Sequence, residues 1–389
     1  MKSIGIQAAS LGGSFHEMAA IEFYGETLVE HTLVPVYDHA ELVERYAQPD
    51  SDLDELLIAV DNTTSGRVLS AIEALRKLSP QFSITGSITI KVEQQLLAHP
   101  ETSIDRITQV LSQKPALDQC DEHIQGSWFT RREHHDTLGA AQLVMKNKGI
   151  VHGRTTAAIA SSLAAKTSGL RVINPQYNDN PDNATKFWVV SPSRLKIVHG
   201  ERTALTFEIP DTPGSLLHAV GILSSRRGLN LTDIDSHLSP LKKGKRGFFV
   251  EVEQRSGSIQ KTVAQLQKAG YHPTVLGSYT PIQPMEVTQP NGSMPPALRH
   301  DTWRGREGLR HQKGSQTLYI ETDHQSGALY RMLGHLTEIN LLDLGRPVIP
   351  KDRHFNRGFY AVVPPRAGTR KIAKALQSLQ SEGFSAKIL

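Results

Sequence analysis

The sequence predicts an α/β domain of two lobes followed by two smaller α+β modules, and three observations lead to this prediction. Short apolar runs alternate with helix-like stretches up to about residue 190, which is typical of a sheet covered by helices. Near residue 195 the pattern changes to one in which two strands follow each helix. That second pattern occurs twice, and a stretch rich in proline and glycine separates the copies.

Length and composition indicate a soluble protein of several domains. The 389 residues exceed one ordinary core and predict two or three domains. An apolar fraction of 38% and a charged fraction of 21% are typical of globular proteins. The formal charge of +4 is small for this length, so we expect no nucleic-acid or membrane partner, whereas an anionic small substrate would suit it.

The number of cysteines and the hydropathy of the chain indicate the cellular compartment of the protein. Cys120 is the single cysteine, so no intramolecular disulfide can form and a reducing compartment is expected. The first residues lack the apolar run of a signal peptide, and no segment reaches the roughly 18 apolar residues of a membrane span. We therefore expect a cytoplasmic protein.

The first region, residues 1–192, has the element pattern of the two-lobed domain. Apolar and β-branched runs predict strands at residues 4–6, 56–60 and 84–91. Helical periodicity predicts helices at residues 15–24, 68–78, 104–113, 138–146 and 156–167. We expect residues 1–85 and 170–192 to form one lobe and residues 86–169 to form the other.

The second region consists of two copies of one module. Strand and helix signals in residues 196–285 have the order βαββαβ, which is that of a ferredoxin-like module. Residues 286–315 have the composition of a linker, and residues 316–389 repeat the module. We expect the copies to pack sheet-to-sheet or helix-to-helix, within one chain or across a dimer, because a lone module leaves strand edges exposed.

Three polar loops are the candidate functional segments, although each has an ordinary structural interpretation. The GGSF turn at residues 12–15 lacks the spacing of a dinucleotide or Walker A loop and fits a plain strand–helix connection. The DNTTSG segment at residues 61–66 fits an Asx-type turn. The NATKF segment at residues 183–187 could simply open an edge strand.

Taken together and in order, five segments resemble the motifs of the prephenate dehydratase family. GSFH at 13–16 resembles G-T-F-S, and VDNTTSGRV at 60–68 resembles P-x-E-N-S-x-x-G-x-V. SQKPALDQC at 112–120 resembles S-H-P-Q-A-L-x-Q-C, DTLGAA at 136–141 resembles S-T-A-x-A-A, and NATKF resembles N-x-T-R-F. The resemblance implies a periplasmic-binding-protein-like catalytic domain with its site in the cleft between two lobes.

The resemblance also implies a reaction and roles for residues. Prephenate, a dicarboxylate, loses carbon dioxide and its ring hydroxyl to become aromatic phenylpyruvate, in phenylalanine biosynthesis. The enzyme must hold both anions and protonate a poor leaving group, which needs no metal and no organic cofactor. By the resemblance, Thr185 is the general acid. The substrate-binding residues are Ser14, Asn62, Thr63, Gly66, Thr137, Asn183, Lys186 and Phe187, of which Phe187 packs behind Thr185.

Four departures from the family pattern leave alternatives open. Asp61 replaces the glutamate, Thr63 the serine, Gln113 the histidine, and Lys186 the arginine, whose bidentate fork lysine lacks. One alternative is a divergent prephenate- or arogenate-processing enzyme of secondary metabolism, either a non-aromatising decarboxylase or a dehydratase variant. The other is a catalytically silent amino-acid-binding regulator.

The first module resembles the phenylalanine-binding ACT domain of the same family. GSLL at residues 214–217 resembles G-A-L, and NLTDIDSHL at 230–238 resembles N-L-T-x-I-E-S-R-P with its arginine lost. The resemblance implies a homodimer or homotetramer with phenylalanine as effector, bound where Gly214 and Asn230 converge. The implied effector-binding residues are Gly214, Leu216, Asn230, Leu231, Asp235 and Ser236.

Two other interpretations are less favoured. Cys120, His123, His134 and His135 superficially suggest zinc, but their spacing matches no closed site, so we predict no metal. The basic run KKGKR at residues 242–246 lacks interleaved aromatic residues and is predicted to be a solvated hairpin rather than a nucleic-acid contact.

Overall fold

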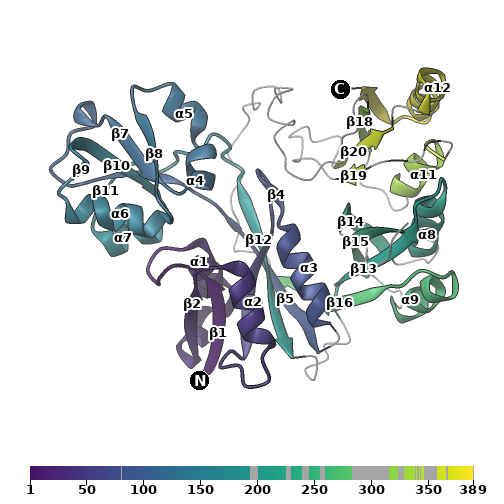
Figure 1. The fold of residues 1–389 in the computed structure, drawn as a ribbon, viewed down its shortest axis with the longest axis horizontal. Coiled ribbons are helices and arrows are strands. Elements are labelled where there is room, and N and C mark those ends of the chain that lie inside the picture. Colours follow the sequence, from purple (N-terminus) through teal and green to yellow (C-terminus); the bar gives the residue numbers. More distant parts are fainter. Residues whose placement is uncertain are drawn as a thin grey trace. The chain divides into compact units, whose positions relative to one another are not determined.

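The computed structural model describes most of the chain as helices and strands with short connections (Figure 1). The described residues are 1–79, 81–192, 200–224, 229–238, 245–254, 259–282, 315–322, 328–337, 339, 341, 343–345, 357–364 and 367–388. Nearly all of the predicted linker and most of the predicted basic hairpin lie outside them. Among the described residues no helix is long and apolar enough to cross a membrane.

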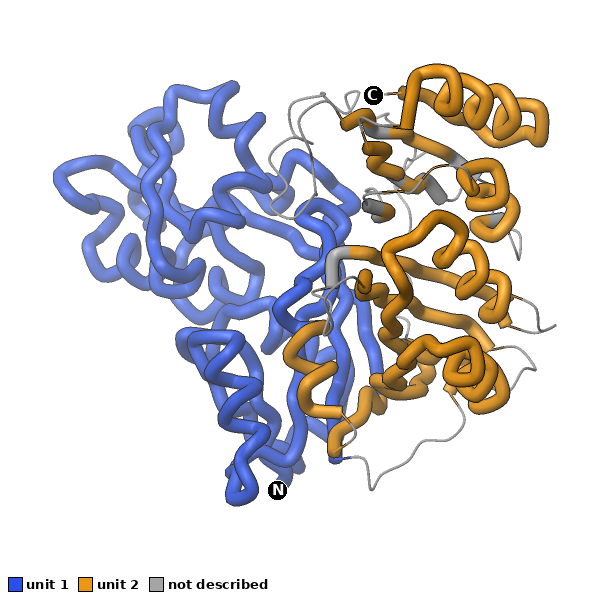
Figure 2. Tube along the Cα trace, turned by 45° about the vertical axis from the view of Figure 1, so that its right-hand side comes forward, with its two compact units in different colours: residues 1–71, 86–192, 282–287 blue, residues 72–85, 193–281, 288–389 orange. Residues whose placement is uncertain are grey.

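The chain divides into two compact units, which Figure 2 shows in different colours. The first unit comprises residues 1–71, 86–192 and 282–287, and the second comprises residues 72–85, 193–281 and 288–389. The first unit contains the polar loops of the candidate site. The second contains both copies of the repeated module.

The larger sheet of the first unit has the strand order β5-β12-β3-β1-β2. Its strands are β1 (Lys2–Gln7), β2 (His31–Val36), β3 (Glu55–Asn62), the short β4 (Gly66–Arg67), β5 (Phe82–Lys91) and β12 (Ala184–Pro192). β1 is parallel to β2 and β3, whereas β12 is antiparallel to β3. The pairing of β3 with β12 brings Asn62 directly opposite Thr185, although the two are far apart in sequence.

Helices of the same unit cover this sheet: α1 (Phe15–Tyr24), the 3₁₀ helix η1 (Gly25–Glu30) and α2 (His39–Ala47). Helix α3 (Leu69–Leu78) begins in the first unit and belongs mostly to the second. The helix predicted at residues 15–24 is confirmed with the same bounds. Its alanines Ala19 and Ala20 are fully buried against Ile4, Ile6 and Leu57 of the sheet. Small side chains on the helix thus allow it to lie close to the strands.

The smaller sheet of the first unit has the order β11-β6-β10-β7-β8, with β9 paired to β10. Its strands are β6 (Gln95–Ala98), β7 (Gln109–Ser112), β8 (Thr130–Glu133), β9 (Ile150–Val151), β10 (Arg154–Ala160) and β11 (Arg171–Asn174). One hydrophobic core includes side chains of α6 (Thr137–Lys146) and α7 (Ser162–Ser168). Another includes those of α4 (Lys114–Asp118) and α5 (Asp121–Gln125), so helices pack on both faces (Figure 1).

Two predicted helices in this region are wrong. Residues 104–113 form the short 3₁₀ helix η2 (Ile104–Arg106) and strand β7, and residues 156–167 form most of β10 and the start of α7. β7 and β10 are central strands whose side chains are buried on both faces. A short apolar run buried on both faces has no period that distinguishes it from a buried helix, and pairing with neighbouring strands decides the outcome.

The chain passes between the two sheets twice, and Asn178 joins the two crossings. Its Oδ1 accepts the backbone N–H of Gln94 at 2.8 Å, and its Nδ2 donates to the backbone carbonyl of Val92 at 2.8 Å. Asn178 is buried, so both ends of its amide are satisfied within the protein. No pattern in the sequence points to this role.

The first module contains β13 (Arg202–Pro210), α8 (Ser215–Ser224), β14 (Leu229–Leu238), β15 (Lys245–Gln254), α9 (Ile259–Lys268) and β16 (Thr274–Tyr279), followed by β17 (Pro281–Ile282). Its strands have the spatial order β14-β15-β13-β16. The second module contains β18 (Gln316–Thr322), α11 (Ala328–Gly334), β19 (Asp343–Gly345), β20 (Arg357–Val363), α12 (Thr369–Ser381) and β21 (Ser385–Ile388). Its order, β19-β20-β18-β21, repeats that of the first, and the α/β fold class is confirmed.

Candidate active site

Asn62 is the centre of a group of hydrogen-bonded side chains at the end of β3. Its Nδ2 donates to Asn183 Oδ1 at 2.8 Å, to Thr185 Oγ1 at 2.9 Å and to the backbone carbonyl of Ala184 at 3.2 Å. We call Asn62, Thr63, Asn183 and Thr185 the Asn–Thr cluster. The structure thus brings together four residues that the sequence placed in two separate motifs.

The hydrogen bonds of the Asn62 side-chain oxygen fix the orientation of its amide group. Its Oδ1 accepts the backbone N–H groups of Thr64 at 2.9 Å and Ser65 at 2.8 Å. A backbone N–H can only donate, so the oxygen must face this turn and the NH₂ group must face Thr185. Thr185 Oγ1 therefore accepts from Asn62, and its own hydroxyl hydrogen takes no part in this bond.

Thr63 and Gly66 fix the conformation of the loop between β3 and β4, and the Thr63 hydroxyl is already hydrogen-bonded within the protein. Thr63 Oγ1 accepts the N–H of Ala184 at 2.9 Å and donates to the carbonyl of Asp182 at 3.2 Å. Gly66 has φ +83° where the chain turns back to pair with Asn62. Both residues fix the loop against the segment that leads into β12.

Asn183 carries an unsatisfied donor. The residue is fully buried, and its Nδ2 has no hydrogen-bond partner among the described residues. Its Oδ1 is already occupied by Asn62. A buried donor without an acceptor costs about 1–3 kcal/mol, which makes this nitrogen a candidate contact for a bound oxygen.

The loop before α1 is held by its own carboxylate. Ser14 is the N-cap of α1 and its Oγ accepts the N–H of Glu17 at 3.0 Å. The Glu17 carboxylate in turn accepts the N–H groups of Gly12 at 2.6 Å and Gly13 at 3.1 Å. The loop therefore binds a carboxylate group that belongs to the protein itself, and the contact of Ser14 with substrate stays a prediction.

Close approach explains the second glycine of this loop. A Cβ at Gly13 would lie 2.9 Å from Ala164 Cβ and 3.0 Å from Leu138 Cδ1. The carbonyl of Gly13 also accepts the hydroxyl of Ser161 at 2.7 Å. Leu138 follows Thr137, the buried first residue of α6, so the loop that carries Ser14 packs against the segment that carries Thr137.

His16 and Phe187 connect this loop to the strand of Thr185. Their ring centroids lie 4.9 Å apart in an edge arrangement, and Phe187 is buried in the core beneath the larger sheet. Burial, and to a smaller extent His39, lower the pKa of His16 to about 3. Its Nε2 is buried with no partner among the described residues, so His16 is a neutral imidazole at pH 7. The sequence placed His16 in the GSFH segment but gave it no role.

His16 should make the protein sensitive to acid. Below about pH 6.5 the unfolded chain protonates this imidazole, whereas the native state does so only near pH 3. Stability should therefore fall by about 1.4 kcal/mol per pH unit between these limits through this group. We expect His16→Phe, which keeps an aromatic ring beside Phe187, to reduce the slope of unfolding free energy against pH in urea titrations. An unchanged slope would contradict the burial argument.

Lys186 is not part of the Asn–Thr cluster. Its Nζ lies 5.7 Å from the centroid of the Trp188 ring, and alternation along β12 directs residues 186 and 188 to the face opposite Phe187. The predicted contact of Lys186 with substrate stays a prediction.

The cysteine and histidines that superficially suggested zinc have different partners. Cys120 is buried, which raises the pKa of its thiol, and His123 Nδ1 pairs with Asp179 at 2.9 Å. His134, His135 and Asp136 have ligand atoms within 4.8 Å of one another, a group that could hold a metal ion. Asp136 also caps α6 through the N–H of Gly139, so its carboxylate has a structural role without any metal.

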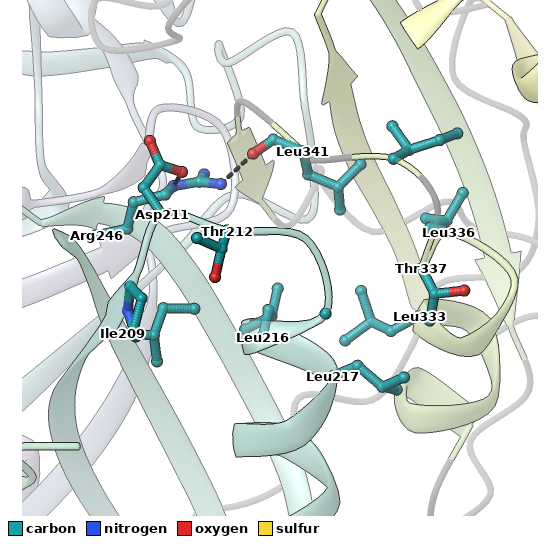
Figure 3. A pocket seen from close by; sticks show the side chains of 13 residues that line it. Ile209, Asp211, Thr212, Leu216, Leu217, Arg246, Leu333, Leu336, Thr337 and Leu341 are labelled. Carbon is teal, nitrogen blue, oxygen red and sulfur yellow. Dashed lines mark hydrogen bonds and ion pairs between the residues drawn. The ribbon is translucent and has the colours of Figure 1, made fainter. Parts of the chain in front are cut away.

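The predicted effector-binding residues of the first module also have different contacts. Gly214 and Leu216 line a cavity in the second unit (Figure 3), whereas Asn230 Nδ2 donates to Glu253 at 3.3 Å. Ser236 bonds the backbone of Leu344 in the second module. Leu231 packs against the module core and Asp235 is buried. The convergence of Gly214 and Asn230 on one ligand stays a prediction.

Comparisons with known proteins agree with the five motifs. The family model described as prephenate dehydratase matches residues 9–194. The bifunctional chorismate mutase/prephenate dehydratase of Aquifex aeolicus is 28% identical over 285 residues, covering 70% of this chain and 73% of that protein. The arogenate dehydratase/prephenate dehydratase 2 of Arabidopsis thaliana is 29% identical over 286 residues, covering 69% of this chain and 70% of that protein.

A solved structure has the same fold. The prephenate dehydratase of Arthrobacter aurescens, in complex with L-Phe, superposes with a TM-score of 0.60 at 21% identity and covers 75% of this chain and 93% of that chain. At this identity the likeness establishes the fold alone. The matched segment, residues 9–194, contains every residue of the Asn–Thr cluster and the loop before α1. This segment belongs to the prephenate dehydratase family, a family of lyases.

Proposed function

We propose that this enzyme converts prephenate to phenylpyruvate by coupled decarboxylation and dehydration, as a step of phenylalanine biosynthesis. The observation that supports this proposal best is the hydrogen bond from Asn62 Nδ2 to Thr185 Oγ1 at 2.9 Å. Because Oγ1 accepts from Asn62, its hydrogen is available to a leaving hydroxyl on the substrate. Thr185 is thereby suited to be the general acid.

The electron and proton balance of the step is simple. The ring carboxylate leaves as carbon dioxide, and its bonding electrons enter the ring to complete the aromatic system. The ring hydroxyl leaves as water after it takes a proton from Thr185, which solvent later restores. While the proton moves, negative charge develops on Thr185 Oγ1, and the Asn62 donor stabilises that charge.

Binding of the two carboxylates needs donors outside this hydrogen bond. Asn183 Nδ2 is buried without a partner among the described residues, and the N-terminus of α6 at Thr137 offers backbone N–H groups. We assign one carboxylate of the substrate to Asn183 Nδ2 and the other to the N-terminus of α6. Ser14 contributes by fixing the loop that packs beside Thr137.

Turnover of two related substrates tests the proposal. We expect the purified protein to produce phenylpyruvate from prephenate, detected by its absorbance in alkali, without added metal. Arogenate, the transaminated analogue, should be assayed in parallel with phenylalanine as the product, since one relative is named for both activities. Carbon dioxide release without an aromatic product would favour the non-aromatising alternative, and no turnover of either substrate would contradict the proposal.

We further propose that the two modules regulate this activity by binding an amino acid, with phenylalanine as the first candidate. The support is the resemblance of the first module to a phenylalanine-binding ACT domain, together with the solved complex of the Arthrobacter aurescens prephenate dehydratase with L-Phe. Feedback by the end product of the pathway would follow. Inhibition of prephenate turnover by added phenylalanine is the test.

A further inference from the structure

Three consecutive residues between β8 and α6 bring two imidazole rings and a carboxylate together. His134, His135 and Asp136 each have a ligand atom within 4.8 Å of those of the other two. The two rings are tilted by 31° with their centroids 4.0 Å apart. His134 and Asp136 are partly buried, whereas His135 is exposed. The first unit therefore presents nitrogen and oxygen donors together at one place that solvent can reach.

The distances between these atoms suit one small cation. His135 Nε2 lies 2.9 Å from Asp136 Oδ2, and His134 Nδ1 lies 3.7 Å from the same oxygen. Two ligands of a tetrahedral zinc ion, each about 2.1 Å from the metal, are about 3.4 Å apart. The two observed distances bracket this value, so small movements of the rings would allow all three atoms to bind one ion. The ion would replace the present contact of His134 Nδ1 with the backbone carbonyl of Asp136 at 3.0 Å.

The Asp136 carboxylate can bind an ion and still cap its helix. Its Oδ1 accepts the N–H of Gly139 at 2.5 Å as the N-cap of α6, whereas its Oδ2 lies between the two histidine nitrogens measured above. A serine, which the similar family motif S-T-A-x-A-A has at this position, caps a helix about as well as an aspartate. Capping alone therefore does not account for a carboxylate at this position, whereas a cation would.

A glycine in α6 makes room for the group. A Cβ at Gly139 would lie 2.6 Å from Asp136 Oδ2 and 2.7 Å from His134 Cε1. Glycine is unfavourable inside a helix, and here the close approach of both side chains requires it. A larger residue at position 139 would displace the carboxylate and the imidazole from their present positions.

We infer that His134 Nδ1, His135 Nε2 and Asp136 Oδ2 form a binding site for a divalent transition metal ion such as Zn²⁺. Imidazole nitrogens suit zinc and its neighbours, whereas Mg²⁺ and Ca²⁺ prefer oxygen ligands alone. Three protein ligands leave the fourth tetrahedral position to water. The sequence grouped these histidines with Cys120 and His123 and matched no closed site, and the structure leaves both of those residues out of the group. The site is independent of the proposed lyase step, which uses no metal.

Calorimetric titration of the full chain tests the inference, with protein that carries no histidine tag and has been treated with a chelator. We expect heat from Zn²⁺ at one tight site per chain and at least tenfold weaker binding of Mg²⁺, because two of the three ligands are imidazoles. Excess Zn²⁺ should also raise Tm, since an ion that binds the folded protein more tightly than the unfolded chain stabilises it.

Two substitutions remove a ligand in different ways. Asp136→Asn keeps an oxygen for the N–H of Gly139, because asparagine is as good an N-cap as aspartate, but it removes the negative charge. His135→Asn removes an exposed imidazole. Each variant should bind Zn²⁺ at least tenfold more weakly than the parent and should lose the rise in Tm. The Tm of each variant without metal reports whether it folds.

His152→Asn is the matched control. His152 is another exposed histidine of the first unit and lies outside the group. Its φ is +51°, a conformation that asparagine adopts readily, so the substitution should be tolerated. This variant should bind Zn²⁺ like the parent and should show the same rise in Tm.

Four results would overturn the inference. The first is the absence of heat from Zn²⁺, and the second is parent-like binding of Zn²⁺ by Asp136→Asn or His135→Asn. The third is binding of Mg²⁺ as tight as that of Zn²⁺, which would contradict imidazole ligation. The fourth is an equal loss of affinity in His152→Asn, because the imidazole removed there lies outside the group.

Discussion

Thr185→Val is expected to lower kcat on prephenate by about 10²-fold or more, since general acid catalysis contributes roughly 10²–10⁴-fold. Valine keeps the branched shape of threonine and removes the hydroxyl that Asn62 holds in place. KM should change far less than kcat, because the proposed carboxylate contacts are made by other groups. Stopped or continuous assays of phenylpyruvate formation measure both constants.

A matched control is available in the smaller sheet. Thr156 is fully buried and its hydroxyl donates to the carbonyl of Arg154 at 2.9 Å, so Thr156→Val removes a buried hydroxyl remote from the Asn–Thr cluster in sequence and sheet. We expect it to lower stability by about 1 kcal/mol with little effect on kcat. A parent-like kcat for Thr185→Val would show that the proton comes from elsewhere.

Asn62→Asp is the second substitution with a large expected effect. The carboxylate keeps an oxygen for the N–H groups of Thr64 and Ser65 but replaces the donor to Thr185 with a second acceptor. Removing one donor aimed at developing charge costs about 10²–10³-fold in kcat, and we expect a loss of this order. The deficit should narrow as the pH falls, because a protonated carboxyl group can donate again.

Asn180→Asp is the control for added negative charge. Asn180 Nδ2 donates to Thr64 Oγ1 at 3.3 Å, so this variant places a carboxylate beside the same loop without touching the bond to Thr185. Both variants should raise KM for a dianionic substrate, whereas the kcat loss and its recovery at low pH should be confined to Asn62→Asp. Equal kcat values in the two variants would contradict the role of Asn62.

Much of the fold and the centre of the site could be predicted from sequence. The helix at residues 15–24 follows a serine suited to cap it and has a glutamate in its first turn, and both are local signals. The motifs that contain Asn62 and Thr185 were recognisable as segments, and the structure adds the bond between them. The helix and the motifs could be predicted because they depend on residue types and on their order along the chain.

The differences between expectation and structure have a common physical cause, which is dependence on partners distant in sequence. Residues 104–113 have an apolar pattern compatible with a helix, and only the neighbouring strands make part of them β7. Lys186 was assigned to substrate because its motif contains Thr185, and that assignment stays a prediction; the structure adds the contact of its Nζ with the Trp188 ring. Gly214 and Asn230 were assigned to one effector site by the resemblance, and the structure adds that Ile339 and Leu341 of the second module line the cavity at Gly214.

The hydrogen bonds between Ser236 and Leu344 have a consequence for how the modules respond to dilution. Two modules on separate chains would associate only as far as the protein concentration allows, whereas two modules on one chain meet at an effective concentration in the millimolar range. Their pairing is then a first-order equilibrium that dilution does not shift. A cell that makes little of this enzyme would therefore keep the paired modules intact in every molecule.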